Sequence, residues 1–197
     1  MKRTARIIRK TTETDINLKL NLDGNGDAVI KTTIAFLDHM LNLFAHHGTI
    51  DLEIKAKGDT EIDTHHLTED MGIVLGMALK KALKDKKGII RYGFASVPMD
   101  DTLVECSVDI SGRPYLVYNM LNDKKSPRKE KEQYTLYEHF FYSLAVNAGI
   151  TIHLNLKYGK NFHHIMEACF KSFARALSAS VTKGRRIKGV PSTKGKL

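Results

Sequence analysis

LDHMLNLFAHHGTIDLEIKAKG, residues 37–58, and YEHFFYSLAVNAGITIHLNLKYG, residues 137–159, are two versions of one pattern that decides the fold. Each begins near an acid-histidine pair, Asp38-His39 in the first and Glu138-His139 in the second, 100 residues apart. Each ends in apolar residues at every second position, which is typical of a strand with one buried face. The chain is therefore predicted to contain an internal repeat.

The repeat extends on both sides of these two stretches. A long run of helix-forming residues follows each alternating strand, at 71–84 in the first half and at 168–181 in the second. Three strand-like runs precede each stretch, at 5–12, 15–22 and 28–35 and again at 93–100, 103–110 and 114–120. We interpret Asp23-Gly24-Asn25-Gly26 as the turn of a hairpin between the second and third runs, and Ser111-Gly112-Arg113-Pro114 as the matching turn.

Each half is therefore predicted as strand-strand-strand-helix-strand-helix. Two copies give an α+β fold in which two four-stranded mixed sheets pack on a layer of four helices. We expect one domain built of two repeats, residues 1–86 and 87–197, which join near Lys86-Lys87-Gly88. The polar segment 122–132, NDKKSPRKEKE, is predicted as a loop with little to bury.

Composition describes an ordinary soluble globular protein. Of the 197 residues, 42% are hydrophobic and 27% are charged, and the chain is long enough to bury a core. No run approaches the roughly 20 apolar residues of a membrane span, and the basic N-terminus lacks the apolar run of a secretory signal. Cys106 and Cys169 have no Cys-x-x-Cys spacing, so we expect two free thiols and a cytoplasmic location.

The net charge of +9 leaves several partners open. Six of the 31 basic residues lie between Lys183 and Lys196. This excess suits a nucleic acid or a small phosphorylated ligand equally well, and it also suits a solvated surface with no specific partner. Aromatic residues are not interleaved with the basic segment, which weakens the case for binding single-stranded nucleic acid.

Two His-His-x-x-Glu segments open the predicted helices. They are THHLTED, residues 64–70, and FHHIMEA, residues 162–168, and their histidines are 98 residues apart. Residues four apart share one face of a helix, so the first histidine and the glutamate of each segment can reach one point. Adjacent histidines are about 100° apart around the axis, so each pair can serve two ions, one on each side.

Together with the two acid-histidine pairs, these segments supply four ligands for each of two metal ions. The predicted ligands are His39, His65, His66, Glu69, His139, His163, His164 and Glu167. Imidazole and carboxylate without thiolate suit Mn, Fe(II), Co or Zn, and four protein ligands leave open positions on an octahedral ion, as in a catalytic site. One such pair alone would more often be a surface or packing feature. His46, His47 and His153 have no counterpart in the other half, so we assign them to packing or surface.

Four residues could together hold a phosphate group. Arg91 and Arg113 flank the strands of the second half, and Ser192 and Lys194 lie on a Gly/Pro-bounded segment near the C-terminus. Two guanidinium groups with a hydroxyl and an ammonium form a reasonable phosphate clamp. Taken singly, each of these charges is more often an exposed surface group.

Six motifs resemble those of the imidazoleglycerol-phosphate dehydratase family of histidine biosynthesis. They are FLDHML, THHLTED, SGRPYL, EHFF, HHIMEACFKSFARAL and VPSTKG, and the similarity runs from Arg6 to Gly195. The resemblance implies a ribosomal S5 domain 2-like fold and dehydration of imidazole glycerol phosphate to imidazole acetol phosphate. It also implies two Mn²⁺ ions per active site, held at the eight ligand positions named above.

The resemblance further implies roles for single residues. Arg91, Arg113, Ser192 and Lys194 match the family's phosphate contacts, Lys171 is a weaker substrate-binding candidate, and Glu13 matches the acid/base glutamate. The reaction is expected to pass through a metal-bound imidazolate and a diazafulvene-type intermediate. One departure stands out, because Leu43 occupies a position where relatives often have glutamine.

The family's assembly implies a homo-oligomer of 24 subunits with active sites completed at subunit boundaries, and neither nucleic acid nor membrane as a partner. Two alternatives remain open on the residues alone. A dinuclear hydrolase could use the same ligands to cleave a phosphate ester with metal hydroxide. A nucleic-acid-binding protein would fit the basic charge and the small sheets.

Overall fold

The computed structural model describes residues 3–120 and 128–197. The first half contains β1 (Thr4–Lys10), β2 (Thr14–Asn21), β3 (Ala28–Lys31), α1 (Ala35–Gly48), β4 (Asp51–Gly58) and α2 (His65–Leu83). The second contains β5 (Tyr92–Met99), β6 (Thr102–Asp109), β7 (Tyr115–Asn119), α3 (Arg128–Ala148), β8 (Thr151–Tyr158) and α4 (Phe162–Val181). Both halves therefore have the predicted order of elements.

Each half forms its own four-stranded mixed sheet. The strand orders are β1-β2-β4-β3 and β5-β6-β8-β7. Within each sheet the last pair, β3 with β4 or β7 with β8, is parallel and the others are antiparallel. The predicted hairpins at 23–26 and 111–114 are wrong, because β4 lies between β2 and β3 and β8 lies between β6 and β7. Parallel neighbours need a crossover connection, and α1 supplies it between β3 and β4.

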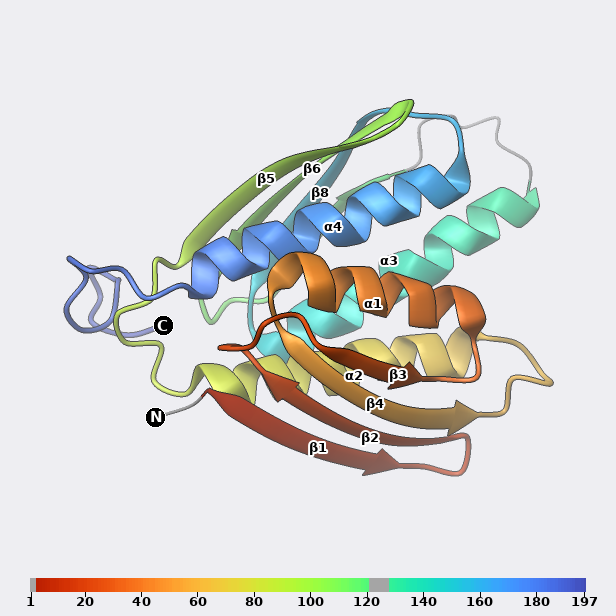
Figure 1. Ribbon diagram of the computed structural model, residues 1–197, viewed down its shortest axis with the longest axis horizontal. Helices are drawn as coiled ribbons and strands as arrows, with labels where there is room; N and C mark the ends of the chain where they lie inside the picture. The colour runs from red at the N-terminus through yellow and green to blue at the C-terminus, as the bar shows by residue number, and fades with distance from the viewer. Residues whose placement is uncertain (1–2, 121–127) are drawn as a thin grey trace.

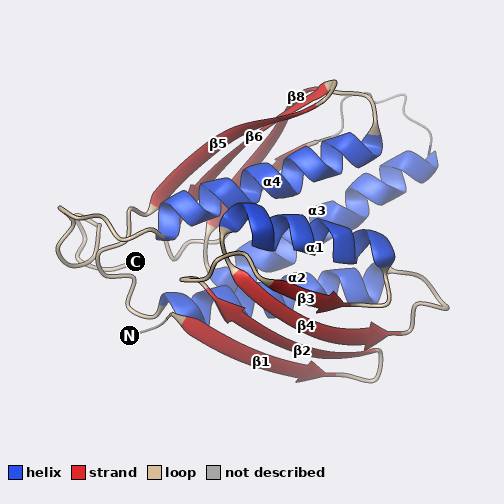
Figure 2. Cartoon of the chain, viewed as in Figure 1, coloured by secondary structure: helices blue, strands red, loops and turns tan. Residues whose placement is uncertain are grey.

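The helices lie between the two sheets (Figures 1 and 2). Alternation of apolar residues explains this arrangement, because every second side chain of β2, such as Ile16, Leu18 and Leu20, is buried against the helices. The helix layer is also where the halves meet, since α2 packs along α3 and α1 packs along α4. The fold therefore brings helices from both halves together in one layer between the sheets (Figure 1).

Glycine allows α2 and α3 to approach closely. A Cβ atom on Gly72 would lie 2.3 Å from the carbonyl oxygen of Phe140, and one on Gly76 would lie 2.6 Å from that of Leu144. No larger residue fits at these positions without moving one of the helices. The same contact brings the first turns of α2 beside His139 of α3.

The polar segment predicted as a loop is helical where the structure describes it. Residues 122–127 lie outside the described residues, but 128–132 form the start of α3, and Arg128 donates to Glu132 at 2.8 Å. Oppositely charged residues four apart stabilise a helix, so the prediction of a loop is wrong for residues 128–132. Cys106 and Cys169 are buried and unpaired, as predicted. Among the described residues, no helix combines the length and apolarity needed to cross a membrane.

Candidate active site

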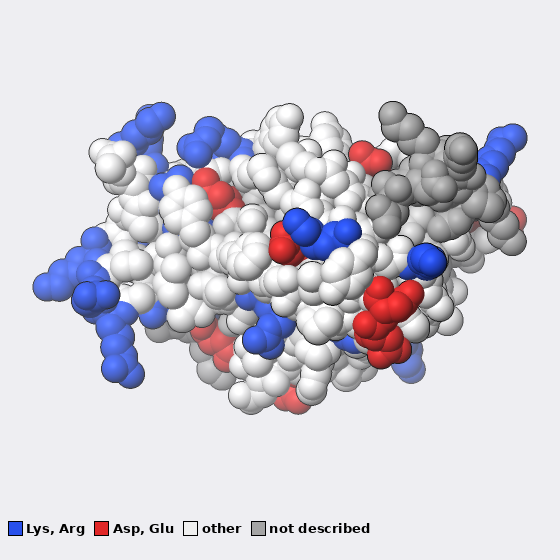
Figure 3. All heavy atoms as spheres, turned by 90° about the horizontal axis from the view of Figure 1, so that it is seen from above, with Lys and Arg blue, Asp and Glu red and all other residues white. Residues whose placement is uncertain are grey.

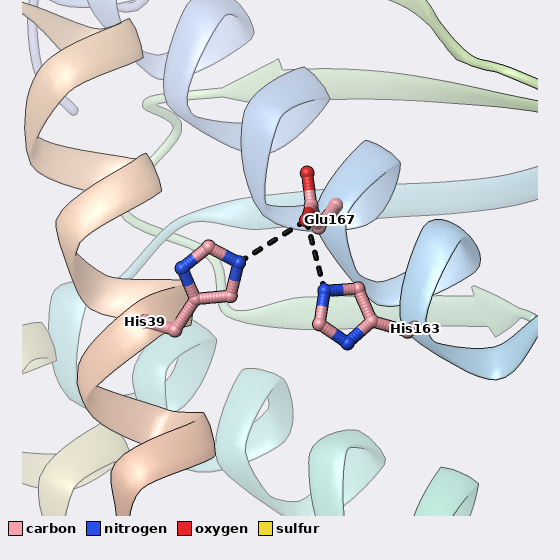
Figure 4. Close-up of side chains that lie close together, drawn as sticks. All are labelled: His39, His163 and Glu167. Carbon is pink, nitrogen blue, oxygen red and sulfur yellow. Dashed lines mark hydrogen bonds and ion pairs between the residues drawn. The ribbon is translucent and has the colours of Figure 1, made fainter.

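His39, His163 and Glu167 form one cluster, in which α1 meets α4 (Figure 4). Nε2 of His39 lies 3.1 Å from Oε1 of Glu167, and Nε2 of His163 lies 2.9 Å from the same oxygen. The three candidate ligand atoms all lie within 4.8 Å of one another. Asn161 caps α4 by accepting from the backbone of His163 and His164, which fixes where this helix begins. We call this set the α1/α4 cluster.

The carboxylate of Glu167 is ionised in this setting. Burial alone would raise its pKa, but hydrogen bonds from Lys171, His39 and His163 outweigh burial and lower the pKa to about 2. Nζ of Lys171 lies 2.5 Å from Oε2, so the two oxygens of the carboxylate have different partners. One oxygen faces the two imidazoles and the other faces the ammonium group.

His65, Glu69 and His139 lie together where α2 meets α3, although among the described residues only the α1/α4 cluster has all its candidate ligand atoms within 4.8 Å of one another. Nε2 of His65 lies 3.3 Å from Oε2 of Glu69, and the ring centroids of His65 and His139 are 5.1 Å apart. Ser143, one turn after His139, donates to the other oxygen of Glu69 at 3.4 Å. We call this set the α2/α3 cluster.

Each cluster is built from both halves of the chain. His39 of the first half meets the His-x-x-x-Glu pair of the second, and His139 of the second half meets that of the first. The helix packing described above causes this exchange, because α1 contacts α4 and α2 contacts α3. Polar side chains of the two halves are thus in contact within each cluster.

The second histidine of each pair has its side-chain partner outside the cluster, Asp59 for His66 and Asp101 for His164. The rings of His65 and His66 are inclined by 83°, and those of His163 and His164 by 88°. Within one chain, the structure therefore brings six of the eight predicted ligands into two groups of three and leaves His66 and His164 outside them.

These two outward histidines have aspartate partners that sequence reasoning missed. Nδ1 of His66 lies 3.0 Å from Asp59, and Nδ1 of His164 lies 2.9 Å from Asp101. The hydrogen bond to Asp59 raises the pKa of His66, and the one from His164 lowers the pKa of Asp101. Both aspartates lie in loops, where no periodic pattern could have pointed to them.

Glu13 lies in the turn between β1 and β2 and belongs to neither cluster. Its side chain is exposed, and its backbone carbonyl accepts from the N–H of Asp59 at 3.1 Å. Residues 10–15 of this turn and 57–59 beside them line one hollow. The predicted acid/base glutamate is therefore next to the loop whose Asp59 contacts His66.

The predicted phosphate contacts gather at the other end of α4. Arg91 and Arg113 share Asp109, at 2.7 Å and 3.6 Å, and Nη1 of Arg91 donates to the carbonyl of Pro191 at 2.9 Å. Ser192 and Lys194 follow Pro191 in the C-terminal segment. Basic side chains project from this end of the molecule (Figure 3, left), which also carries the chain's C-terminus in Figure 1.

A single chain does not bring these cations to its own clusters. The backbone N–H of Arg91 donates to Ser180 near the end of α4, whereas Glu167 lies in the second turn. Thirteen residues of helix separate Glu167 from Ser180, which is roughly 20 Å at 1.5 Å per residue. Lys171 is the exception among the substrate-binding candidates, because it contacts Glu167 directly.

Comparison with known proteins identifies the family of this chain. A model of the family "Imidazoleglycerol-phosphate dehydratase" matches residues 32–177, a span that includes α1, α2, α3, most of α4 and both clusters. This chain belongs to the imidazoleglycerol-phosphate dehydratase family. Dehydratases are hydro-lyases, so the prediction of a hydro-lyase of histidine biosynthesis is confirmed.

Relatives of known name match the whole chain. The imidazoleglycerol-phosphate dehydratases of Trichlorobacter lovleyi and Acetivibrio thermocellus are each 55% identical, and each alignment covers 100% of both chains. The crystal structure of the Staphylococcus aureus enzyme is 40% identical with a TM-score of 0.79, covering 92% of this chain and 99% of that one. That of the Pyrococcus furiosus enzyme in complex with (S)-C348 is 38% identical with a TM-score of 0.80, covering 97% and 100%. The predicted fold class is therefore confirmed.

Leu43, the departure from the dehydratase pattern, lies outside both clusters. It is on α1, one turn after His39, and it packs against the hydrophobic core. Ser143 holds the equivalent place on α3, 100 residues later, and contacts Glu69. The two clusters of this dehydratase family member therefore differ in the side chain that follows the lone histidine.

Proposed function

We propose that this chain dehydrates imidazole glycerol phosphate to imidazole acetol phosphate with two divalent metal ions, Mn²⁺ being expected, at sites shared between subunits. The observation that carries the proposal is the pair of clusters, each with two imidazoles and one carboxylate from both halves of the chain. Repetition of one donor set in two places would give one set of ligands to each of two ions.

The donors fit such ions. Each cluster offers nitrogen and carboxylate oxygen without thiolate, a set that suits borderline-to-hard divalent ions. Glu167 stays ionised because its pKa is lowered to about 2, so its negative charge is available to a cation near neutral pH. His39, His163 and Glu167 would hold one ion and His65, Glu69 and His139 the other. Each set leaves room on an octahedral ion for a further protein ligand and for substrate.

His66 and His164 are proposed as the fourth ligands, supplied by neighbouring copies of the chain. Their Nδ1 atoms contact Asp59 and Asp101 and not a cluster residue, and Arg91 binds α4 at Ser180, roughly 20 Å along the helix from Glu167. Apolar side chains such as Phe94 and Tyr115 are 61% and 64% exposed on the sheets, which suits burial between subunits. A homo-oligomer, expected to have 24 subunits as in the dehydratase family, would bring the clusters, the outward histidines and the phosphate-binding residues of different chains together.

The chain's own residues account for binding and proton transfer. Arg91, Arg113, Ser192 and Lys194 would hold the phosphate group, with Lys171 as a further cation. Glu13 would take the carbon-bound proton beside the imidazole ring or return one to the leaving hydroxyl. Bound divalent ions would lower the pKa of the ring N–H and fix the ring's orientation.

The proposed reaction breaks one C–H and one C–O bond and releases water. Electron density from the ring expels the neighbouring hydroxyl, which gives a conjugated diazafulvene-type species. Loss of the side-chain proton then gives the enol, and the enol becomes the ketone. The unpaired buried thiols of Cys106 and Cys169 accord with the reducing cytoplasm that we propose as its location, and neither nucleic acid nor membrane is expected as a partner.

An assay that follows two products tests the proposal. Metal-free protein, protein with added Mn²⁺ and chelated protein are each incubated with imidazole glycerol phosphate. Ketone is measured by absorbance after alkali, and inorganic phosphate is measured in the same samples. We expect ketone with Mn²⁺, its loss on chelation and no phosphate. Release of phosphate would favour the dinuclear hydrolase instead.

A further inference from the structure

Two aspartates make the same contact with the two outward-facing histidines. Asp59 Oδ2 lies 3.0 Å from Nδ1 of His66, and Asp101 Oδ1 lies 2.9 Å from Nδ1 of His164. In both cases the carboxylate engages Nδ1 rather than Nε2. The Asp59 side chain is only 18% exposed, so its contact is enclosed by neighbouring residues.

Duplication of the half-chain does not explain these contacts, because the aspartates occupy different loops. Asp101 precedes Thr102 in the turn before β6, and the matching residue before Thr14 in the first half is Glu13. Asp59 follows β4, where the second half has glycine and lysine before α4. Two unrelated loop positions therefore supply the same acid to the same ring nitrogen.

The contact determines which nitrogen of each ring is left for a ligand. A neutral imidazole that donates from Nδ1 to a carboxylate carries its lone pair on Nε2. Within the clusters, His39, His65 and His163 also direct Nε2 toward a carboxylate oxygen. A carboxylate behind the ring also makes a ligating imidazole a stronger donor and holds its plane.

We infer that Asp59 and Asp101 are positioning residues, which hold His66 and His164 so that Nε2 is presented to a divalent ion. The inference rests on the proposed function, because it concerns the same ions. Asp100 is a different kind of neighbour, since its carboxylate lies 3.8 Å from Nε2 of His164 and its side chain is 71% exposed. Asp100 is near Nε2, the nitrogen that would bind the ion, and it makes no contact with Nδ1 that would orient the ring.

The test is direct Mn²⁺ binding to the assembled protein by titration calorimetry. The variants are Asp59→Ala and Asp101→Ala, with Asp59→Asn and Asp101→Asn as conservative partners that keep one acceptor oxygen. Glu61→Ala, an exposed acid in the same loop as Asp59, is the matched control. We expect the alanine variants to bind Mn²⁺ about 10- to 100-fold more weakly, the asparagine variants to be intermediate, and the control to match the unchanged protein.

The outcomes separate this inference from the proposed function. If the unchanged protein binds no Mn²⁺, the proposed function fails and the inference falls with it. If the unchanged protein binds Mn²⁺ and both alanine variants bind it within twofold, the proposed function stands and the inference is overturned. A second readout is the melting temperature of the metal-free variants. If weaker binding is matched by lower metal-free stability, with no recovery in the asparagine variants, the aspartates are merely structural and the inference is likewise overturned.

Discussion

Lys171 Nζ lies 2.5 Å from Oε2 of Glu167, whereas Oε1 of the same carboxylate faces His39 and His163. The two oxygens therefore divide their roles between a cation of the chain and the proposed metal ion. The α2/α3 cluster differs, because the oxygen of Glu69 that does not face His65 accepts from the hydroxyl of Ser143. The ammonium group is thus a feature of one cluster and not of both.

Lys171→Met should weaken substrate binding more than metal binding. His39, His163 and Glu167 remain to hold the ion, but the phosphorylated substrate loses a charged partner worth about 1.5–3 kcal/mol. We expect KM to rise tenfold or more, by about 1.4 kcal/mol per factor of ten, while the Mn²⁺ content stays the same. Lys19→Met is the matched control, because Lys19 pairs with Glu53 at 2.9 Å on an exposed sheet surface. Loss of Mn²⁺ with an unchanged KM would make Lys171 a clamp for Glu167 instead.

Glu13→Gln should lower turnover roughly a hundredfold or more, because the amide cannot accept or deliver the proton. The metal content should not change, since Glu13 belongs to neither cluster. Steady-state rates and metal analysis of the same preparation check both parts. Glu61→Gln, an exposed acid that lines the same hollow, is the control and should keep its rate. Near-normal turnover of the Glu13 variant would remove this residue from the mechanism.

Gly72→Ala should lower the free energy of unfolding by about 1–3 kcal/mol, the usual cost of overpacking. The added Cβ would lie 2.3 Å from the carbonyl oxygen of Phe140, so α2 and α3 must separate. Alanine at an exposed helical glycine would instead stabilise the protein, by up to about 1 kcal/mol. Chemical denaturation of the metal-free protein decides the sign. A stabilised variant would mean that the two helices do not approach as described.

Asp51 should contribute to the free energy of unfolding at neutral pH, and this contribution should be lost at acidic pH. Its pKa is lowered, chiefly because its carboxylate accepts the backbone N–H of Asn25 at 2.8 Å and also the side chain of Asn21 at 2.9 Å. A lowered pKa contributes stability above the unfolded value of about 3.8, and that stability is lost as the pH falls through the folded value. Asp51→Asn should therefore lower the free energy of unfolding by about 1 kcal/mol at pH 7 and by less at pH 3. Asp15→Asn, at a carboxylate 3.8 Å from Nζ of Lys10, is the control, and a difference independent of pH would contradict the assignment.

Local spacing predicted the part of the site that a single helix creates. His65 with Glu69 and His163 with Glu167 are in contact because residues four apart share one helix face. The exchange of His39 and His139 between halves could not be read from spacing, since it depends on which helices pack across the layer. The same limit explains the error at 23–26, because a turn signal is local whereas the insertion of β4 between β2 and β3 is not.

The aspartates behind the outward histidines were beyond sequence reasoning for another reason. Asp59 and Asp101 lie in loops, and loops carry no periodicity that assigns a side chain to a partner. Their non-equivalent positions also hid them from a comparison of the two halves. The contact of each aspartate with its histidine is seen only in the folded chain.

The measurement that tests the central claim most directly is the number of Mn²⁺ ions bound per chain. It is made by metal analysis after dialysis against a fixed low concentration of free Mn²⁺, for the unchanged protein, His39→Ala and His139→Ala. If the two clusters each hold one ion, the unchanged protein binds two per chain and each variant binds about one. Two ions per chain in both variants, or none in the unchanged protein, would contradict this account.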